Sequence, residues 1–243
     1  SSPMSRLDKL RHDPKAFIVD AWAKRFGVFA LPIDKLLDEE RAVRAARDLG
    51  PEVRFVYFPW IEGHGDALMR HLDAPELSIR PLLLFSAGAG RRERAGRQRA
   101  INLRPDRYRE SAARVLRALP SSVAAVLFSM DWHPSMRQLV FACKEVGLPT
   151  VLIPHEGMFA DQNRYYVDIT TGVDCPLCDV TLAWGDQQAR IFAERGYPRE
   201  RIVVTGAPKF DVYHGFQSRL SPEDSARVYG WAEPRPLVVF ACQ

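Results

Sequence analysis

Short apolar runs alternate with amphipathic stretches along most of the chain. Each run is rich in β-branched and aliphatic residues and has the length of a buried strand. Strands are predicted at residues 54–58, 79–85, 123–128, 150–154, 179–184 and 201–205. Apolar residues at helical spacing between the runs predict helices at residues 33–48, 67–71, 105–119, 135–146, 187–195 and 222–229. The alternation predicts an α/β fold with a doubly wound, mainly parallel sheet.

The same pattern divides the chain into three parts. Residues 1–50 are expected to form a helical segment that packs on the main domain, and its basic residues near the start make a membrane-surface contact an alternative. Residues 51–235 form the α/β domain. Residues 236–243 contain a last apolar run with nothing after it to cover it, so we expect the first strand or linker of a truncated second domain.

Composition agrees with a soluble globular protein. Of 243 residues, 47% are hydrophobic and 26% are charged. No apolar run approaches the ~20 residues that a membrane span needs, and no signal peptide is present, so a cytoplasmic location is expected.

Basic residues gather locally although the net charge is only +4. Five arginines fall between residues 88 and 102, which predicts a solvated loop that could attract an anionic glycan, a phosphate or a membrane surface. Nucleic acid is not expected as a partner, because aromatic residues are not interleaved with this cluster.

The four cysteines do not suggest a disulfide scaffold. Cys175 and Cys178 have C-x-x-C spacing, but they precede a predicted strand rather than open a helix. No second C-x-x-C or spaced histidine pair completes a zinc site. A structural role is therefore predicted, and no metal is expected.

Polar side chains follow two predicted strands that a βαβ unit would place side by side. Asp131 and His133 come after the run at 123–128, and His155, Glu156 and Gly157 come after the run at 150–154, which Pro154 ends. The carboxyl ends of parallel strands are where open α/β sheets place their ligands. The sequence therefore predicts a site at this edge.

Two residues elsewhere are candidates for binding substrate at the same site. His64 lies between two glycines after the first strand, and Arg164 lies in a stretch with few strand or helix signals, which suggests a ligand or lid loop.

A family resemblance rests on four segments: residues 147–151, the Pro154-His155-Glu156-Gly157 motif, residues 182–185 and residues 203–211. Together they resemble the N-terminal, acceptor-side domain of GT-B glycosyltransferases that build bacterial surface polysaccharides. Residues 9–20 resemble a segment of capsule and lipopolysaccharide transferases, including those that use CMP-Kdo. The similarity covers roughly residues 120 to 212.

The resemblance implies one Rossmann-like half of a GT-B fold, with a second, C-terminal domain to hold the nucleotide sugar. Glu156 matches the acidic residue before glycine in bacterial sialyltransferases, which implies that it is the catalytic base. Related glycerophosphate polymerases have a histidine before glycine, which would favour His155. Asp131 is a third candidate.

The function implied is transfer of a sugar from a nucleotide-activated donor, such as CMP-Kdo, to a hydroxyl of a surface glycan or glycolipid. No cofactor beyond the donor is expected, and the site of action would be the inner face of the bacterial inner membrane. One alternative is a polyol-phosphate transferase of the CDP-glycerol type or a nucleotide-sugar 2-epimerase-like enzyme. Another is a non-catalytic domain that docks on an anionic membrane or a protein partner.

Overall fold

The computed structural model describes residues 33–59, 68–69, 72, 74–85, 91–157, 175–215, 217 and 220–233. Several expectations lie outside the described residues. They concern the basic N-terminal helices, His64, Arg164 and the apolar run at 236–243.

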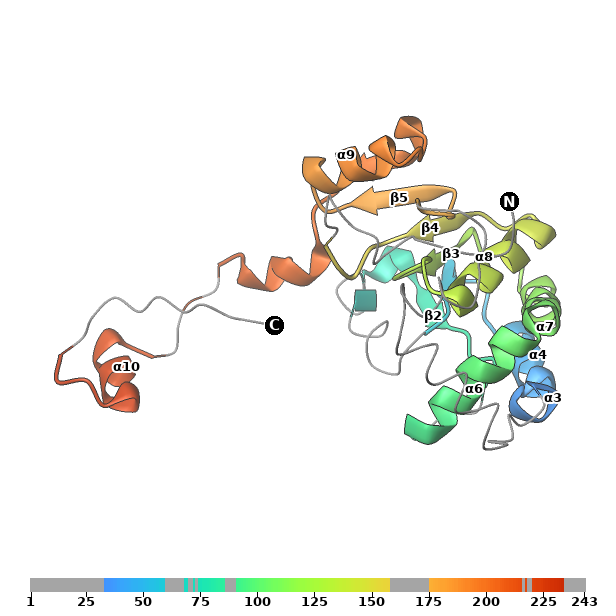
Figure 1. Ribbon diagram of the computed structural model, residues 1–243, viewed down its shortest axis with the longest axis horizontal. Coiled ribbons are helices and arrows are strands. Elements are labelled where there is room, and N and C mark those ends of the chain that lie inside the picture. The colour runs from blue at the N-terminus through green and yellow to red at the C-terminus, as the bar shows by residue number, and fades with distance from the viewer. Residues whose placement is uncertain are drawn as a thin grey trace, which may run out of the picture. The chain divides into compact units, whose positions relative to one another are not determined.

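The described strands form one parallel sheet, which confirms the α/β, Rossmann-like fold (Figure 1). Its order is β2-β1-β3-β4-β5-β6. The strands are β1 (Phe55–Tyr57), β2 (Ile79–Pro81), β3 (Ala125–Phe128), β4 (Thr150–Leu152), β5 (Val180–Ala183) and β6 (Ile202–Val204).

The strand order reverses once, between β1 and β3. The chain runs from β1 outward to β2 and then crosses to β3 on the other side of β1, after which each strand adds next to the last. In open α/β sheets a ligand binds outside the carboxyl ends of the strands at such a switch point. The residues that follow β3 therefore stand at the position where this fold favours a site.

Helices α6 (Arg91–Leu103), α7 (Pro105–Arg117), α8 (Pro134–Val146) and α9 (Asp186–Glu194) connect strands, and Figure 1 shows them around the sheet. Helices α3 (Ile33–Leu36) and α4 (Glu39–Arg47) precede β1, and α10 (Pro222–Tyr229) follows β6 in the chain. The helix predicted at 33–48 is divided into α3 and α4, because Leu37 bridges to Phe85 and the Asp38 N–H donates to the Leu84 carbonyl. Gly147 ends α8 in the left-handed conformation (φ 75°), which favours glycine.

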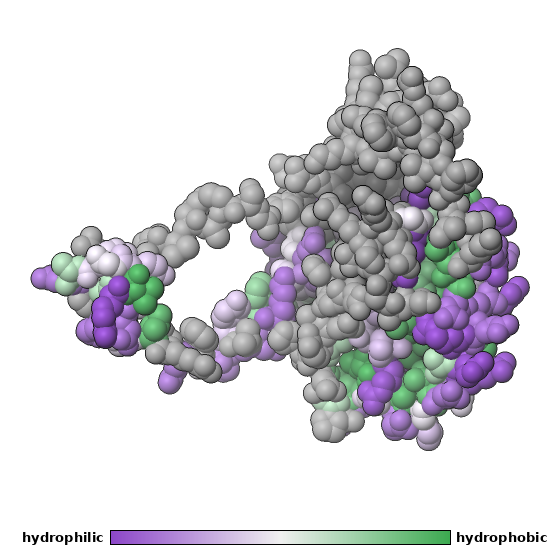
Figure 2. Space-filling model, turned by 90° about the horizontal axis from the view of Figure 1, so that it is seen from below, coloured by the Kyte–Doolittle hydropathy of each residue, from purple (hydrophilic) through white to green (hydrophobic). Residues whose placement is uncertain are grey.

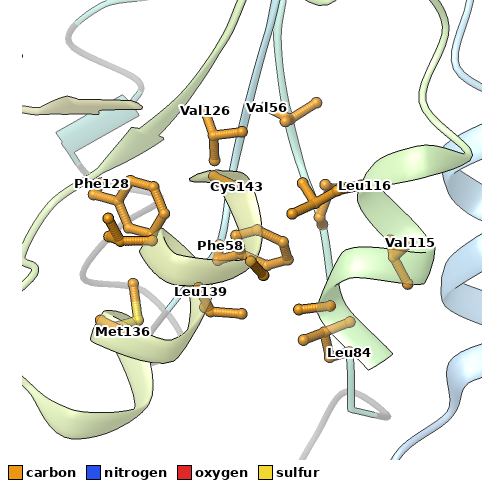
Figure 3. Close-up of a cluster of buried hydrophobic side chains, with 14 of the residues drawn as sticks. Val56, Phe58, Leu84, Val115, Leu116, Val126, Phe128, Met136, Leu139 and Cys143 are labelled. Atoms are coloured by element: carbon orange, nitrogen blue, oxygen red, sulfur yellow. The ribbon is translucent and has the colours of Figure 1, made fainter. Parts of the chain in front are cut away.

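Two hydrophobic clusters cover the two faces of the sheet. Side chains alternate along each strand, so Val126 and Phe128 enter the larger cluster while Leu127 enters the smaller one. Figure 3 shows Leu116 of α7 and Leu139 of α8 in the same cluster as Val126 and Phe128. All four residues of β3 are buried, as expected for the centre of a parallel sheet.

The arginine-rich segment is helical, so the solvated loop predicted between residues 88 and 102 is wrong over the part that α6 covers. The helix packs through Ala100 and Ile101, which are 3% and 4% exposed. The Arg97 guanidinium lies 5.0 Å from the centre of the Phe85 ring, and that ring stacks on Tyr108 of α7. The arginine run concealed this helix because its apolar residues are few.

Contacts divide the chain into two units, residues 1–208 and residues 209–243. The smaller unit contains α10, which begins with a reciprocal capping box between Ser221 and Asp224. Figure 2 shows hydrophobic residues on the surface of this unit, and Val228 and Tyr229 are 68% and 54% exposed.

An ion-pair network ties α3 and α4 to α7. Arg107 bonds Asp34 (2.6 Å) and Glu39 (3.0 Å), and Arg114 bonds the other oxygen of Glu39 (2.8 Å). Burial of the Glu39 carboxylate by itself raises its pKa, but the hydrogen bonds from Arg114 and Arg107 outweigh burial and lower its pKa from the ordinary value. The folded state therefore favours the ionised carboxylate.

Replacement of Glu39 by Gln is expected to lower the free energy of unfolding at pH 7 by about 1 kcal/mol, the scale of a partly buried ion pair. Because the pKa of Glu39 is lowered on folding, its contribution is complete above the unfolded-state pKa and is lost as the pH falls through the folded-state pKa. Urea unfolding of both proteins at pH 7 and at about pH 3 measures this. A difference that persists undiminished in acid would contradict it.

Candidate functional site

His155 and Glu156 form a hydrogen-bonded pair immediately beyond the carboxyl end of β4. The Nε2 atom of His155 lies 2.9 Å from Oε1 of Glu156. The imidazole is largely enclosed, with its side chain 12% exposed, whereas the Glu156 side chain is 42% exposed. One oxygen of the carboxylate is thus engaged by histidine while the group as a whole stays accessible.

The Ser129 carbonyl holds the other side of the imidazole. It accepts a hydrogen bond from the His155 backbone N–H (3.1 Å) and lies 2.8 Å from Nδ1. A carbonyl oxygen can only accept, so Nδ1 carries its hydrogen. The ring orientation is therefore set by main-chain atoms of the strand next to β4.

This anchoring determines which ring nitrogen faces Glu156. With the hydrogen of Nδ1 directed at the Ser129 carbonyl, Nε2 is the nitrogen that lies 2.9 Å from Oε1. The two groups are therefore placed so that a proton can be shared between the imidazole and the carboxylate.

Trp184 and Gln188 hold the loop on which the pair is carried. The indole N–H of Trp184 donates to the Pro154 carbonyl (2.7 Å), and the Gln188 amide donates to the Glu156 carbonyl (3.2 Å). The backbone N–H of Trp184 donates in turn to Oε1 of Gln188 (2.8 Å). The sequence did not single out Gln188.

The pair lies beside the topological switch of the sheet. Ser129, which anchors His155, is the first residue after β3, and β3 is one of the two strands between which the order reverses. The structure thus brings the end of β4 to the end of β3, as the βαβ pattern predicted. The place is the one that this type of sheet favours for a ligand.

Asp131 also follows β3, but its carboxylate accepts hydrogen bonds from the backbone. The residue is fully buried (0% exposed), and Oδ2 accepts hydrogen bonds from the N–H groups of Leu177 (2.6 Å) and Cys178 (3.0 Å). A carboxylate engaged in this way ties the segment before β5 to the end of β3. Its burial disfavours the role of base that was considered for it from sequence.

His133 occupies the N-cap position of α8, and its ring contacts neighbouring residues. Its Nδ1 lies 2.9 Å from the Ser135 hydroxyl, and its ring meets that of Trp132 edge-on. Burial lowers the pKa of His133 to about 4. The ring is therefore neutral near pH 7, which suits hydrogen bonding to a substrate rather than charge attraction.

The remaining predicted site residues divide into one that is described and two that are not. Gly157 is exposed and follows Glu156; a β-carbon there would lie 3.8 Å from the Trp184 ring, an ordinary contact. His64 and Arg164 lie outside the described residues, so their placement at the site stays a prediction.

An open depression of about 530 Å³ lies elsewhere, between α9 and β6. The described residues that line it include Arg190, Arg199 and Val204, and they do not include His155 or Glu156.

The cysteines before β5 are packed into the fold. Cys178 is 1% exposed, and burial, together with the nearby Asp131 carboxylate, raises the pKa of its thiol well above the ordinary value. A thiol that resists ionisation is a poor nucleophile and metal ligand. Within the described part of the chain, no three His, Cys, Asp or Glu side chains are arranged to hold a metal ion.

Comparison with models of known protein families gives no match, and no curated protein matches the chain. In the described segments, no helix has the length and apolar character needed to cross a membrane.

Asp131→Ala is expected to lower the free energy of unfolding by about 3 kcal/mol, because one buried and one partly buried N–H group lose their acceptor. Asp131→Asn keeps one acceptor oxygen and should cost less. Glu156→Ala is the matched control, with a loss below about 1 kcal/mol for its more exposed carboxylate. Urea unfolding followed by circular dichroism measures all three, and equal losses for Asp131→Ala and Glu156→Ala would refute the structural role.

The lowered pKa of His133 makes stability fall in mild acid. The unfolded chain binds a proton on this histidine near pH 6.5, whereas the folded chain does so only near pH 4, so stability is lost as the pH falls between these values. We expect wild type to lose about 1 kcal/mol more than His133→Asn between about pH 7 and pH 5, after allowance for partial exposure. Unfolding curves at the two pH values test this, and parallel losses would contradict it.

Proposed function

We propose that the protein is a glycosyltransferase that moves a sugar from a nucleotide-activated donor to a hydroxyl group, with Glu156 as the general base. The observation that carries the proposal is the His155–Glu156 pair at the carboxyl edge of the sheet, half open to solvent at the carboxylate. The resemblance of the Pro154-His155-Glu156-Gly157 motif to GT-B enzymes of bacterial surface polysaccharides supports the same chemistry.

Glycosyl transfer to a hydroxyl needs a proton acceptor within hydrogen-bond reach of the attacking oxygen. Glu156 fits this role because Oε1 faces His155 and the exposed part of the carboxylate can face an acceptor. As the acceptor oxygen bonds to the anomeric carbon, the bond from that carbon to the donor phosphate breaks. The hydroxyl proton passes to the pair, and the phosphate leaves with the bonding electrons.

His155 stabilises the proton after its transfer. Its Nδ1 hydrogen is committed to Ser129, so Nε2 is the nitrogen that can share the proton with Glu156. The pair before reaction would lack this proton and would gain it from the acceptor. His155 is thus proposed as the partner of the base rather than the base itself.

The donor and acceptor are proposed from the resemblance alone. The donor would be a CMP-linked sugar such as CMP-Kdo, its nucleotide held by a second lobe facing this domain, and the acceptor a surface glycan or glycolipid at the inner membrane. A neutral His133 near the same edge could hydrogen-bond a sugar hydroxyl.

This chain alone is expected to be inactive without the second lobe, so the test uses the full-length protein. There Glu156→Gln is expected to reduce turnover by about 10²-fold or more, because the amide keeps the shape but cannot accept a proton. Nucleotide release from CMP-Kdo, CMP-sialic acid, CDP-glycerol and UDP-sugars, with candidate glycan acceptors, would measure it. Glu200→Gln, an exposed carboxylate outside the site, is the matched control and should be unaffected.

Three outcomes would count against the proposal. Near-normal turnover in Glu156→Gln would remove Glu156 as the base. Release from CDP-glycerol alone would indicate polyol-phosphate transfer. No release from any donor by the full-length wild-type protein, with its second lobe present, would refute the proposal.

A further inference from the structure

We infer that Gln188 is a positioning residue that sets the geometry of the His155–Glu156 pair from the first turn of α9. The inference rests on the proposed function only for its effect on turnover, because its structural consequence can be measured without catalysis. Gln188 holds the backbone carbonyl of Glu156 and would act on the carboxylate through that backbone.

The amide of Gln188 bridges two strand ends. On one side its Oε1 accepts from the Trp184 N–H (2.8 Å), directly after β5. On the other side its Nε2 donates to the Glu156 carbonyl (3.2 Å), just beyond β4. Since a backbone N–H must donate and a carbonyl must accept, the two partners leave only one orientation for the amide.

The bridge is buried. Gln188 is only 6% exposed, although it lies in the first turn of a helix where polar side chains commonly face solvent. Loss of a buried amide would leave a donor and an acceptor unsatisfied, and the loop would have to move to find water. The side chain is therefore a fixed spacer between β5 and the site loop.

The loop is held on both sides of His155. Trp184 fixes the Pro154 carbonyl before the histidine, and Gln188 fixes the Glu156 carbonyl after it. The contact of 2.9 Å between Nε2 and Oε1 depends on the relative placement of these adjacent residues. Loss of the hydrogen bond from Gln188 to the Glu156 carbonyl would free the backbone that carries the carboxylate. The imidazole would still be held by the Ser129 carbonyl.

Two substitutions at position 188 test the hydrogen bonds that Gln188 makes to Trp184 and Glu156. Gln188→Glu has nearly the same size and still accepts from Trp184, but its second oxygen faces the Glu156 carbonyl and repels it. Gln188→Ala removes both bonds. Gln187→Ala, at the exposed neighbouring position, is the matched control.

The first measurement needs no substrate. Long-range ¹H–¹⁵N spectra of the histidine rings report the protonation of Nδ1 and Nε2, and His155→Gln identifies the His155 signals by their loss. In Gln188→Glu the Nε2 signal is expected to move toward its position in Glu156→Ala, in which the pair is broken. The Gln187→Ala spectrum should match wild type.

The second measurement is turnover in the assay of the proposed function. Gln188→Glu is expected to lower kcat about 10- to 100-fold with little change in KM, because a misplaced base affects the transition state more than binding. If Gln188 had only a structural role, its replacement would lower the amount of folded protein, and kcat per folded molecule would not fall. Thermal unfolding monitored by circular dichroism establishes that each variant is folded.

The outcomes distinguish the two proposals. An unchanged Nε2 signal in folded Gln188→Glu overturns the positioning role. A shifted signal with full turnover of Glu156→Gln supports positioning and refutes the proposed base. If Gln188→Ala does not fold, Gln188→Glu alone decides. A shifted signal in Gln188→Glu with unchanged kcat overturns the catalytic consequence of positioning.

Discussion

The carbonyl oxygen of Ser129 is the point on which the candidate site depends. It accepts from both the backbone and the ring of His155, and it belongs to the residue directly after the central strand β3. Because β3 is buried on both faces, this oxygen cannot shift without disturbing the core. The packing of the sheet is thereby transmitted to one imidazole tautomer and, through it, to the carboxylate of Glu156.

The sequence was sufficient for the architecture and for the position of this pair. Apolar runs of strand length alternated with amphipathic stretches, and a parallel sheet is the layer that such alternation builds. The Pro154-His155-Glu156-Gly157 motif followed one of these runs, so its placement at a strand end needed only the rule that proline interrupts pairing. Register and strand order, in contrast, depend on tertiary packing that no local pattern contains.

Other features were hidden because one residue type can serve opposite purposes. Asp131 at a strand end looked like a catalytic carboxylate, yet it accepts from two backbone N–H groups, and only the fold brings residues 177 and 178 to it. The arginine run obscured α6 because its apolar residues are few. A glutamine three positions into a helix after Trp184 was a usable signal, since that position often reaches back to satisfy a preceding N–H.

Hydrogen bonds to the main-chain oxygens of residues 129, 154 and 156 hold the loop that carries the pair. Every amino acid supplies such an oxygen, so these hydrogen bonds do not depend on which side chains occupy those three positions. They depend instead on the side chains that bind the oxygens: the imidazole of His155, the indole of Trp184 and the amide of Gln188. The side chain at position 156 could therefore be exchanged while the backbone scaffold that presents it stays intact.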